Sequence, residues 1–152
     1  MSGADVARRA ARRLGRVPVA LGAAGRVLAA EALLRTTRLP TMARLMGTPL
    51  ASRDDAASAV AGPLDLSDAE ARRMRAVGRV LRLSPFGSTC LRRALCAGHA
   101  LRRRGPRLVV GVAKRDGVVS AHAWLVVDGV NLDPDGSVEF LPLSLGEGSV
   151  TA

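Results

Sequence analysis

A cysteine and a histidine in the second half of the chain could together carry out covalent acyl transfer. Cys90 follows Ser88 and Thr89, which are residue types that cap helices, so we expect it in the first turn of a helix. There, unpaired backbone N–H groups and the positive end of the helix dipole stabilise a thiolate and activate a nucleophile. His122 lies in an apolar, β-rich run that predicts a strand, from which it could act as the base.

The second cysteine and the second histidine are less suited to this chemistry. Cys96 lies more than a turn into the same predicted helix, away from the dipole end, which favours a structural role. His99 follows Cys90 by nine residues, so at about 100° per residue it lies on the opposite helix face. The two cysteines point about 120° apart and lack paired ligand spacing, which argues against a disulfide and against a metal site. We therefore expect no metal, no cofactor and a reducing, cytoplasmic compartment.

Two aspartates could orient the imidazole of His122. An Asp-Gly pair at 128–129 predicts a two-residue hairpin that folds the next strand back against the strand of His122. In that register position 135 opposes His122, and position 133 lies on the same face. Either Asp133 or Asp135 can therefore complete the arrangement of nucleophile, base and orienting acid that covalent acyl transfer requires.

The elements that must position these residues read as helices first and strands afterwards. Residues 1–47 predict two helices, followed by a small-residue connection over 48–63, and a Ser67/Glu70 capping box predicts a helix through about Leu83. The Cys90 helix should run to about Arg104, before strands over 108–113 and 121–127 and a short strand from Val130. Because no crossover helix separates these strands, the fold class is α+β. In the first two helices the expected buried positions are Val27, Leu28, Leu33, Leu34 and Leu45.

The charge of the chain restricts its partners. The 152 residues fit one compact domain, and the net charge of +10 comes almost wholly from arginine. Such a field favours acidic peptides, nucleic acid or an anionic membrane, but an aromatic content of 2% argues against nucleic acid. Arginines precede a short apolar run, Val17 to Ala24, but Arg26 follows it without a clear cleavage site, so we predict no signal peptide and no spanning helix. The basic N-terminal region could instead contact a partner or a membrane surface.

Five short stretches resemble one family when they are taken together and in order. They are Cys90 to Leu95 (CLRRAL), Leu101 to Gly105 (LRRRG), Val110 to Val112 (VGV), Ala121 to Trp124 (AHAW) and Asp128 to Gly129 (DG). This set closely resembles the lasso-peptide leader peptidases, a branch of the transglutaminase-like cysteine proteases. The resemblance covers roughly Leu83 to Leu143 and is looser before that range.

The resemblance implies a fold and a mechanism. The expected fold is a transglutaminase-like, papain-like core over residues 63–152, with the nucleophile helix packed on a small antiparallel sheet and an N-terminal helical docking region over 1–62. Cys90 would attack the carbonyl after the last leader residue, His122 would transfer the proton, and water would release the acyl-enzyme. Asp133 is the preferred acid because an Asp-Pro pair here resembles transglutaminase-like enzymes, with Asp135 as the alternative. The interval from Gly129 to Asp133 is about one residue shorter than the family pattern.

The resemblance also implies partners. They are the precursor peptide, a separate winged-helix leader-recognition protein, because no such domain is predicted in this chain, and an ATP-dependent lasso cyclase. Two other functions stay open: a transglutaminase-like amidase or acyltransferase acting on another peptide, and a non-catalytic basic adaptor. Arg92 and Arg93, which follow the nucleophile, are left unassigned.

Overall fold

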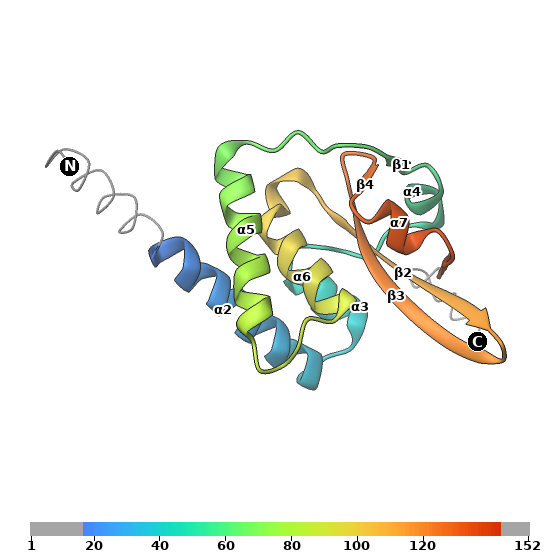
Figure 1. The fold of residues 1–152 in the computed structure, drawn as a ribbon, viewed down its shortest axis with the longest axis horizontal. Helices are drawn as coiled ribbons and strands as arrows, with labels where there is room; N and C mark the ends of the chain where they lie inside the picture. The colour runs from blue at the N-terminus through green and yellow to red at the C-terminus, as the bar shows by residue number, and fades with distance from the viewer. Residues whose placement is uncertain (1–16, 144–152) are drawn as a thin grey trace, which may run out of the picture.

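A layer of helices packs against one face of a five-stranded sheet (Figure 1). The computed structural model describes residues 17–143, apart from the side chains of residues 17, 134 and 135. Its helices are α2 (Val17–Thr36), α3 (Leu39–Leu45), α4 (Arg53–Ala57), α5 (Asp68–Leu83), α6 (Cys90–Ala100), the 3₁₀ helix η1 (Arg102–Arg104) and α7 (Pro134–Ser137). Its strands are β1 (Val60–Ala61), β2 (Arg107–Arg115), β3 (Val118–Val127), β4 (Val130–Asn131) and β5 (Leu141–Pro142). The predicted α+β class is confirmed.

Local sequence signals set the ends of the two helices that carry most of the site. The predicted capping box opens α5. The Ser67 hydroxyl accepts a hydrogen bond from the Glu70 backbone N–H, and the Glu70 carboxylate accepts one from the Ser67 backbone N–H. Thr89 caps α6 by accepting a hydrogen bond from the Arg92 backbone N–H over 3.3 Å. Gly105, in the left-handed conformation, follows η1 and ends the helical segment before β2. The predicted start of the Cys90 helix is thus confirmed.

The sheet has the order β1-β4-β3-β2-β5. The predicted Asp-Gly hairpin joins β3 to β4: Asp128 and Gly129 have φ angles of 51° and 75°, and Val127 pairs with Val130. Two positive φ angles are typical of the type I′ turn that matches strand twist. The sheet is not wholly antiparallel, however, because β1 pairs with β4 in parallel.

The segment 48–63 is more ordered than the predicted connection. Ser52 and Asp55 form a second capping box, which opens α4, and β1 follows at the edge of the sheet. Leu50 also makes a parallel bridge to Leu108 of β2. The Ser-x-x-Asp spacing was the available signal for α4, whereas a two-residue edge strand has no sequence periodicity that could have revealed β1.

Alternate residues of β3 face two different apolar clusters. Ala123, Leu125 and Val127 join the main core with the helices, while Trp124 and Val126 pack on the other face. This alternation is the one expected of a strand that is buried on both faces. The main core contains residues from both sides of the proposed 62/63 boundary, including Ala23, Val27 and Ala30 of α2. The docking role of the N-terminal region stays a prediction.

The prediction of buried positions in the first two helices was partly wrong. Val27 is buried, and Leu33 and Leu34 pack against the core, but Leu28 is 59% and Leu45 62% exposed. α2 presents small residues four and three apart, Ala23, Val27 and Ala30, to α5 and α6, and Leu28 lies about 100° from that row. No helix within residues 17–143 is long and apolar enough to cross a membrane.

Candidate functional site

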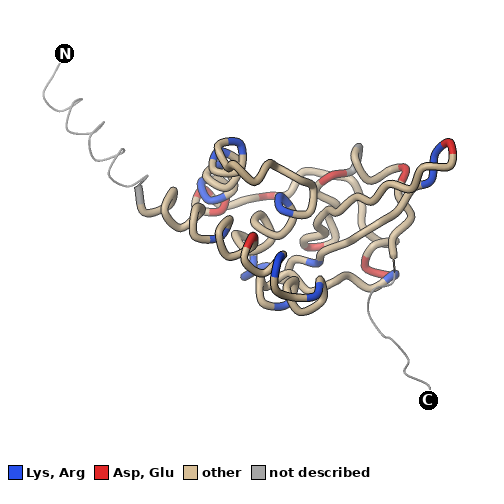
Figure 2. Tube along the Cα trace, turned by 90° about the horizontal axis from the view of Figure 1, so that it is seen from below, with Lys and Arg blue, Asp and Glu red and all other residues tan. Residues whose placement is uncertain are grey.

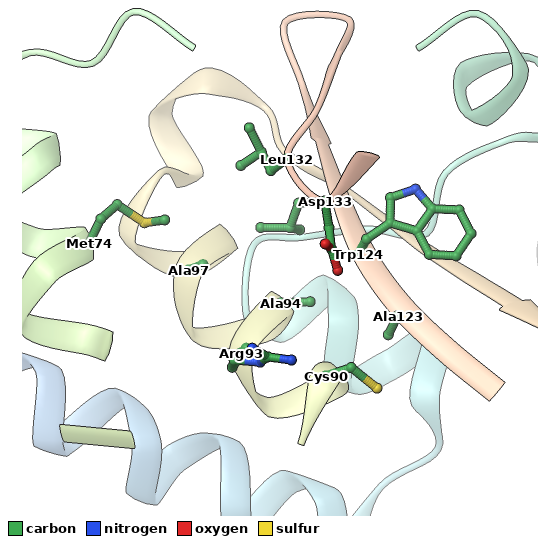
Figure 3. Close-up of a pocket in the computed structure, with 10 residues that line it drawn as sticks. Met74, Cys90, Arg93, Ala94, Ala97, Ala123, Trp124, Leu132 and Asp133 are labelled. Atoms are coloured by element: carbon green, nitrogen blue, oxygen red, sulfur yellow. The ribbon is translucent and has the colours of Figure 1, made fainter. Parts of the chain in front are cut away.

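Cys90 is the first residue of α6, as predicted, and its thiol is free and partly exposed. It lines a cleft of about 230 Å³ between α5, α6 and the β3–β4 hairpin. Met74, Arg93, Ala123 and Asp133 line the same cleft. Figure 3 shows the Cys90 side chain on α6 and the Asp133 carboxylate on the chain that follows β4. The structure therefore brings the predicted nucleophile and the preferred acid to one cleft.

His122 is held by Asp133, with 2.8 Å between Nε2 of the ring and Oδ2 of the carboxylate. The His122 side chain is 14% exposed and the Asp133 side chain is 43% exposed, so the pair lies at the edge of the protein interior. The Asp133 backbone N–H donates to Oδ1 of Asn131 over 2.9 Å, which fixes the bend after β4. Because Nε2 is occupied, Nδ1 is the imidazole nitrogen left available for proton transfer.

The imidazole lies in an aromatic corner on the face of the sheet that points away from α5 and α6. Its ring stacks on Trp124, with centroids 5.9 Å apart, and tilts against Phe140 at 5.1 Å. Gly111 pairs with His122 across β2 and β3. A Cβ at Gly111 would come within 2.8 Å of Trp124 and 2.9 Å of Phe140, so the glycine of the Val-Gly-Val stretch makes room for this corner.

The structure does not join all three predicted catalytic residues. Within the described residues no hydrogen bond connects Cys90 to His122, and the neighbour of His122 in β3, Ala123, is on the face that packs against the helices. The cysteine and the aspartate share the cleft, and the histidine is connected to it through the aspartate.

The geometric reason for keeping Asp135 as the alternative is not met. A regular hairpin would have placed position 135 opposite His122, but β4 ends at Asn131 and α7 begins at Pro134. Asp133 is the residue before α7, with φ −141° and ψ 61°, and this bend turns its carboxylate to the histidine. The Asp135 side chain lies outside the described part of the chain.

The other cysteine and histidine make separate contacts. Cys96 is fully buried, and burial raises the pKa of its thiol to about 11, although Arg26 and Arg92 oppose the shift. His99 has its Nδ1 atom 3.0 Å from the Met46 carbonyl oxygen, and burial lowers its pKa. The burial of Cys96 agrees with the structural role expected for it, and His99 makes no contact with Cys90 among the described residues.

A buried glutamate that the sequence reading overlooked contacts the start of α6. Glu31 is 7% exposed and forms salt bridges with Arg92, over 2.8 Å, and with Arg35, over 2.9 Å. Arg92 also donates to the Phe86 carbonyl over 2.6 Å, in the loop before Cys90. Glu31 is the only acidic residue between positions 17 and 53, and a lone acid in an arginine-rich helix was the available signal. Arg92, unassigned from the sequence, therefore anchors the start of α6, next to Cys90.

Metal-binding side chains do not cluster in the described part of the chain. No group of three or more His, Cys, Asp and Glu side chains in residues 17–143 is close enough together to hold an ion. The site combines a cysteine at a helix start with a histidine–aspartate pair on the adjoining sheet, and these are the residue types that cysteine-dependent acyl transfer uses.

Comparison with known families agrees with this class. The family model described as the transglutaminase-like superfamily matches residues 5–144, and the chain belongs to this superfamily. Its members typically use a cysteine in catalysis, so the domain indicates an activity of the cysteine protease or acyltransferase type. Searches of curated proteins and of solved structures found no significant match.

Proposed function

We propose that this chain is a cysteine peptidase that removes the leader from a lasso-peptide precursor. The observation that carries the proposal is the cleft shared by Cys90 and Asp133, with His122 held on the Asp133 carboxylate. The superfamily match supports acyl transfer by a cysteine. The five sequence stretches that resemble leader peptidases are the reason for proposing a lasso-peptide precursor as the substrate.

In the proposed mechanism Cys90 attacks the carbonyl carbon of the last leader residue. Nδ1 of His122 takes the thiol proton and returns it to the leaving amine, while Asp133 keeps the second ring nitrogen protonated. Water then attacks the thioester and releases the leader as a carboxylate. Within the described residues no hydrogen bond joins the thiol to the imidazole, so the proposed mechanism requires the His122 side chain to move toward Cys90 when the peptide fills the cleft.

The partners are part of the same proposal. A separate winged-helix protein would bind the leader, and an ATP-dependent cyclase would receive the released core peptide in the cytoplasm. The excess of arginine over acidic residues suits contacts with acidic segments of such partners or of the leader.

The test is mass spectrometry of a precursor incubated with this protein and its recognition partner. The parent should cut once, at the junction of leader and core, and Cys90→Ala should not cut at all. Cys96→Ala is the matched control, since it removes the other thiol and should leave cleavage intact. An intact precursor after incubation with folded, bound parent protein would overturn the peptidase proposal and favour the adaptor.

An acyltransferase is the second candidate, because the superfamily includes cysteine chemistry of both kinds. Both reactions share the thioester at Cys90 and differ in whether water or an amine attacks it. Cleavage in the presence of a small primary amine separates them. A hydrolase releases a leader with a free carboxylate, whereas an acyltransferase releases a leader that carries the amine as an amide.

A further inference from the structure

Four arginines from three different elements converge on one pocket. Arg26 comes from α2, Arg73 from α5, and Arg102 and Arg103 from η1, and together with Ala100 they line a cavity of about 120 Å³. Figure 2 shows that blue segments recur along the coiled parts of the tube. Ala100 follows Cys90 by ten residues on the same helix, about 15 Å at 1.5 Å per residue, so this pocket is separate from the cleft of Cys90.

The charges in this pocket are not neutralised by the described part of the chain. Within residues 17–143 the salt bridges involve other arginines, namely Arg35, Arg92, Arg104 and Arg115. Glu70 is near enough to be influenced by Arg73, but its carboxylate is already bound by Ser67 and Arg104. A pocket with four guanidinium groups and no carboxylate of its own has a strongly positive potential.

The hydrogen-bonding capacity of Arg26, which lines the pocket, is not fully used by the described residues. Its Nε atom is buried and has no hydrogen-bond partner among the described residues. Burial, Arg102 and Arg73, in that order, lower the pKa of Arg26. Arg102 is partly fixed in place, because its Nη1 donates to the His99 carbonyl oxygen over 3.3 Å. An anion in the pocket would offset the mutual repulsion of these groups.

We infer that this pocket binds an oxyanion, a phosphate group or a single carboxylate. Guanidinium groups present forked N–H donors that match the paired oxygens of both groups. The volume of about 120 Å³ is enough for one such group and lies below the roughly 300–1,000 Å³ of pockets that hold drug-sized ligands. The inference does not depend on the proposed peptidase activity.

The test is a titration of the full-length protein with inorganic phosphate at constant ionic strength, followed by calorimetry and by thermal unfolding. Binding should saturate and raise the unfolding midpoint by an amount on the order of a few degrees. Arg103→Ala, at an exposed position, and Arg73→Ala should each weaken binding at least tenfold. Arg79→Ala is the matched control, because it removes an exposed arginine of α5 outside the pocket and should leave the affinity within about twofold of the parent.

A parallel titration with N-acetyl-glutamate amide identifies the source of the oxyanion. Saturable, Arg103-dependent binding of phosphate alone indicates a phosphorylated ligand or free phosphate. The same behaviour with the glutamate derivative indicates an acidic side chain of a peptide or protein. The inference is overturned if neither probe saturates, if chloride at equal ionic strength has the same effect, or if Arg73→Ala and Arg103→Ala both bind like the parent.

Discussion

Glu31 of α2 and Arg92 of α6 form a salt bridge, with 2.8 Å between Oε2 and Nη2 and 2.9 Å between Oε2 and Nε. Arg35 holds the other carboxylate oxygen over 2.9 Å, so a buried acid sits between two guanidinium groups. Arg92 stands two residues after Cys90 and also holds the Phe86 carbonyl of the preceding loop. The Glu31 side chain thus links α2 to the start of α6, where Cys90 lies.

Glu31→Gln should slow precursor cleavage because it loosens this anchor. A neutral amide leaves Arg92 without its charged partner, and small displacements of a nucleophile lower rates strongly, so we expect a loss on the order of 10- to 100-fold. The initial rate of cleavage by mass spectrometry measures it. Glu139→Gln is the control, since Glu139 pairs with Arg115 in an exposed position and should change the rate less than about twofold. Equal rates for Glu31→Gln and the parent would contradict the anchoring role.

The same substitution should alter acid unfolding. Burial opposes ionisation of Glu31, but the hydrogen bonds from Arg92 and Arg35 outweigh it and lower the pKa of the carboxyl. A lowered folded-state pKa contributes stability that is present above the unfolded-state pKa, about 4.3, and is lost as the pH falls below it. The free energy of unfolding of Glu31→Gln should therefore fall less steeply between about pH 5 and 3 than that of the parent. Denaturant melts across this range, with Glu139→Gln as reference, provide the measurement.

Signals that act within one turn or one hairpin were readable from the sequence. The Ser67/Glu70 capping box, the Thr89 cap and the Asp-Gly turn each depend on neighbouring residues, and each is present as predicted. They were enough to place Cys90 at a helix start and His122 on a strand, because those placements require only local geometry.

Relationships between distant segments were not readable. Glu31 and Arg92 are 61 positions apart, and nothing in either helix pattern pairs them. The choice between Asp133 and Asp135 depended on where β4 would end, which is decided by Asn131 binding both the Asp133 backbone and the Ser137 hydroxyl. The alternation of side chains along two strands predicts facing residues only while the strands pair regularly. It does not predict a bend that side-chain hydrogen bonds stabilise.

Gly98→Ala should destabilise the fold, because α6 passes close to the segment before α4 at this position. A Cβ on Gly98 would lie 2.0 Å from Cγ2 of Thr48 and 3.2 Å from Leu125, and Thr48 is fully buried. We expect a loss of about 1 to 3 kcal/mol in the free energy of unfolding. Gly25→Ala is the matched control: Gly25 lies in α2 with nothing within 4 Å of an added Cβ, so alanine there should stabilise by up to about 1 kcal/mol. Chemical denaturation of both variants checks the difference in sign.

Cys96 should make the protein less stable in alkali. Burial raises the pKa of this thiol to about 11, so the folded state keeps the proton that the unfolded state loses at about pH 8.5. That contribution is complete below about pH 8.5 and is lost as the pH rises towards 11. The chain has no tyrosine and one lysine, so few other side chains titrate in this window. Unfolding free energies between pH 8 and 11 should fall for the parent and for Cys90→Ala, and should fall less for Cys96→Ala, by roughly 2 kcal/mol across the window.

Asp133→Asn tests whether Asp133 or the nearby Asp135 is the acid that orients His122. An amide at position 133 can still accept a hydrogen bond from His122, but it no longer carries the charge that stabilises an imidazolium. Loss of this charge in comparable triads lowers the rate by up to about 10⁴-fold, and we expect at least about 100-fold here, with the unfolding midpoint nearly unchanged. Asp116→Asn, in the exposed β2–β3 turn where φ is 49°, is the control, since asparagine tolerates this conformation. If Asp133→Asn cleaves at the parent rate while Asp135→Asn does not, the role of Asp133 is wrong and the acid belongs two residues further along the chain.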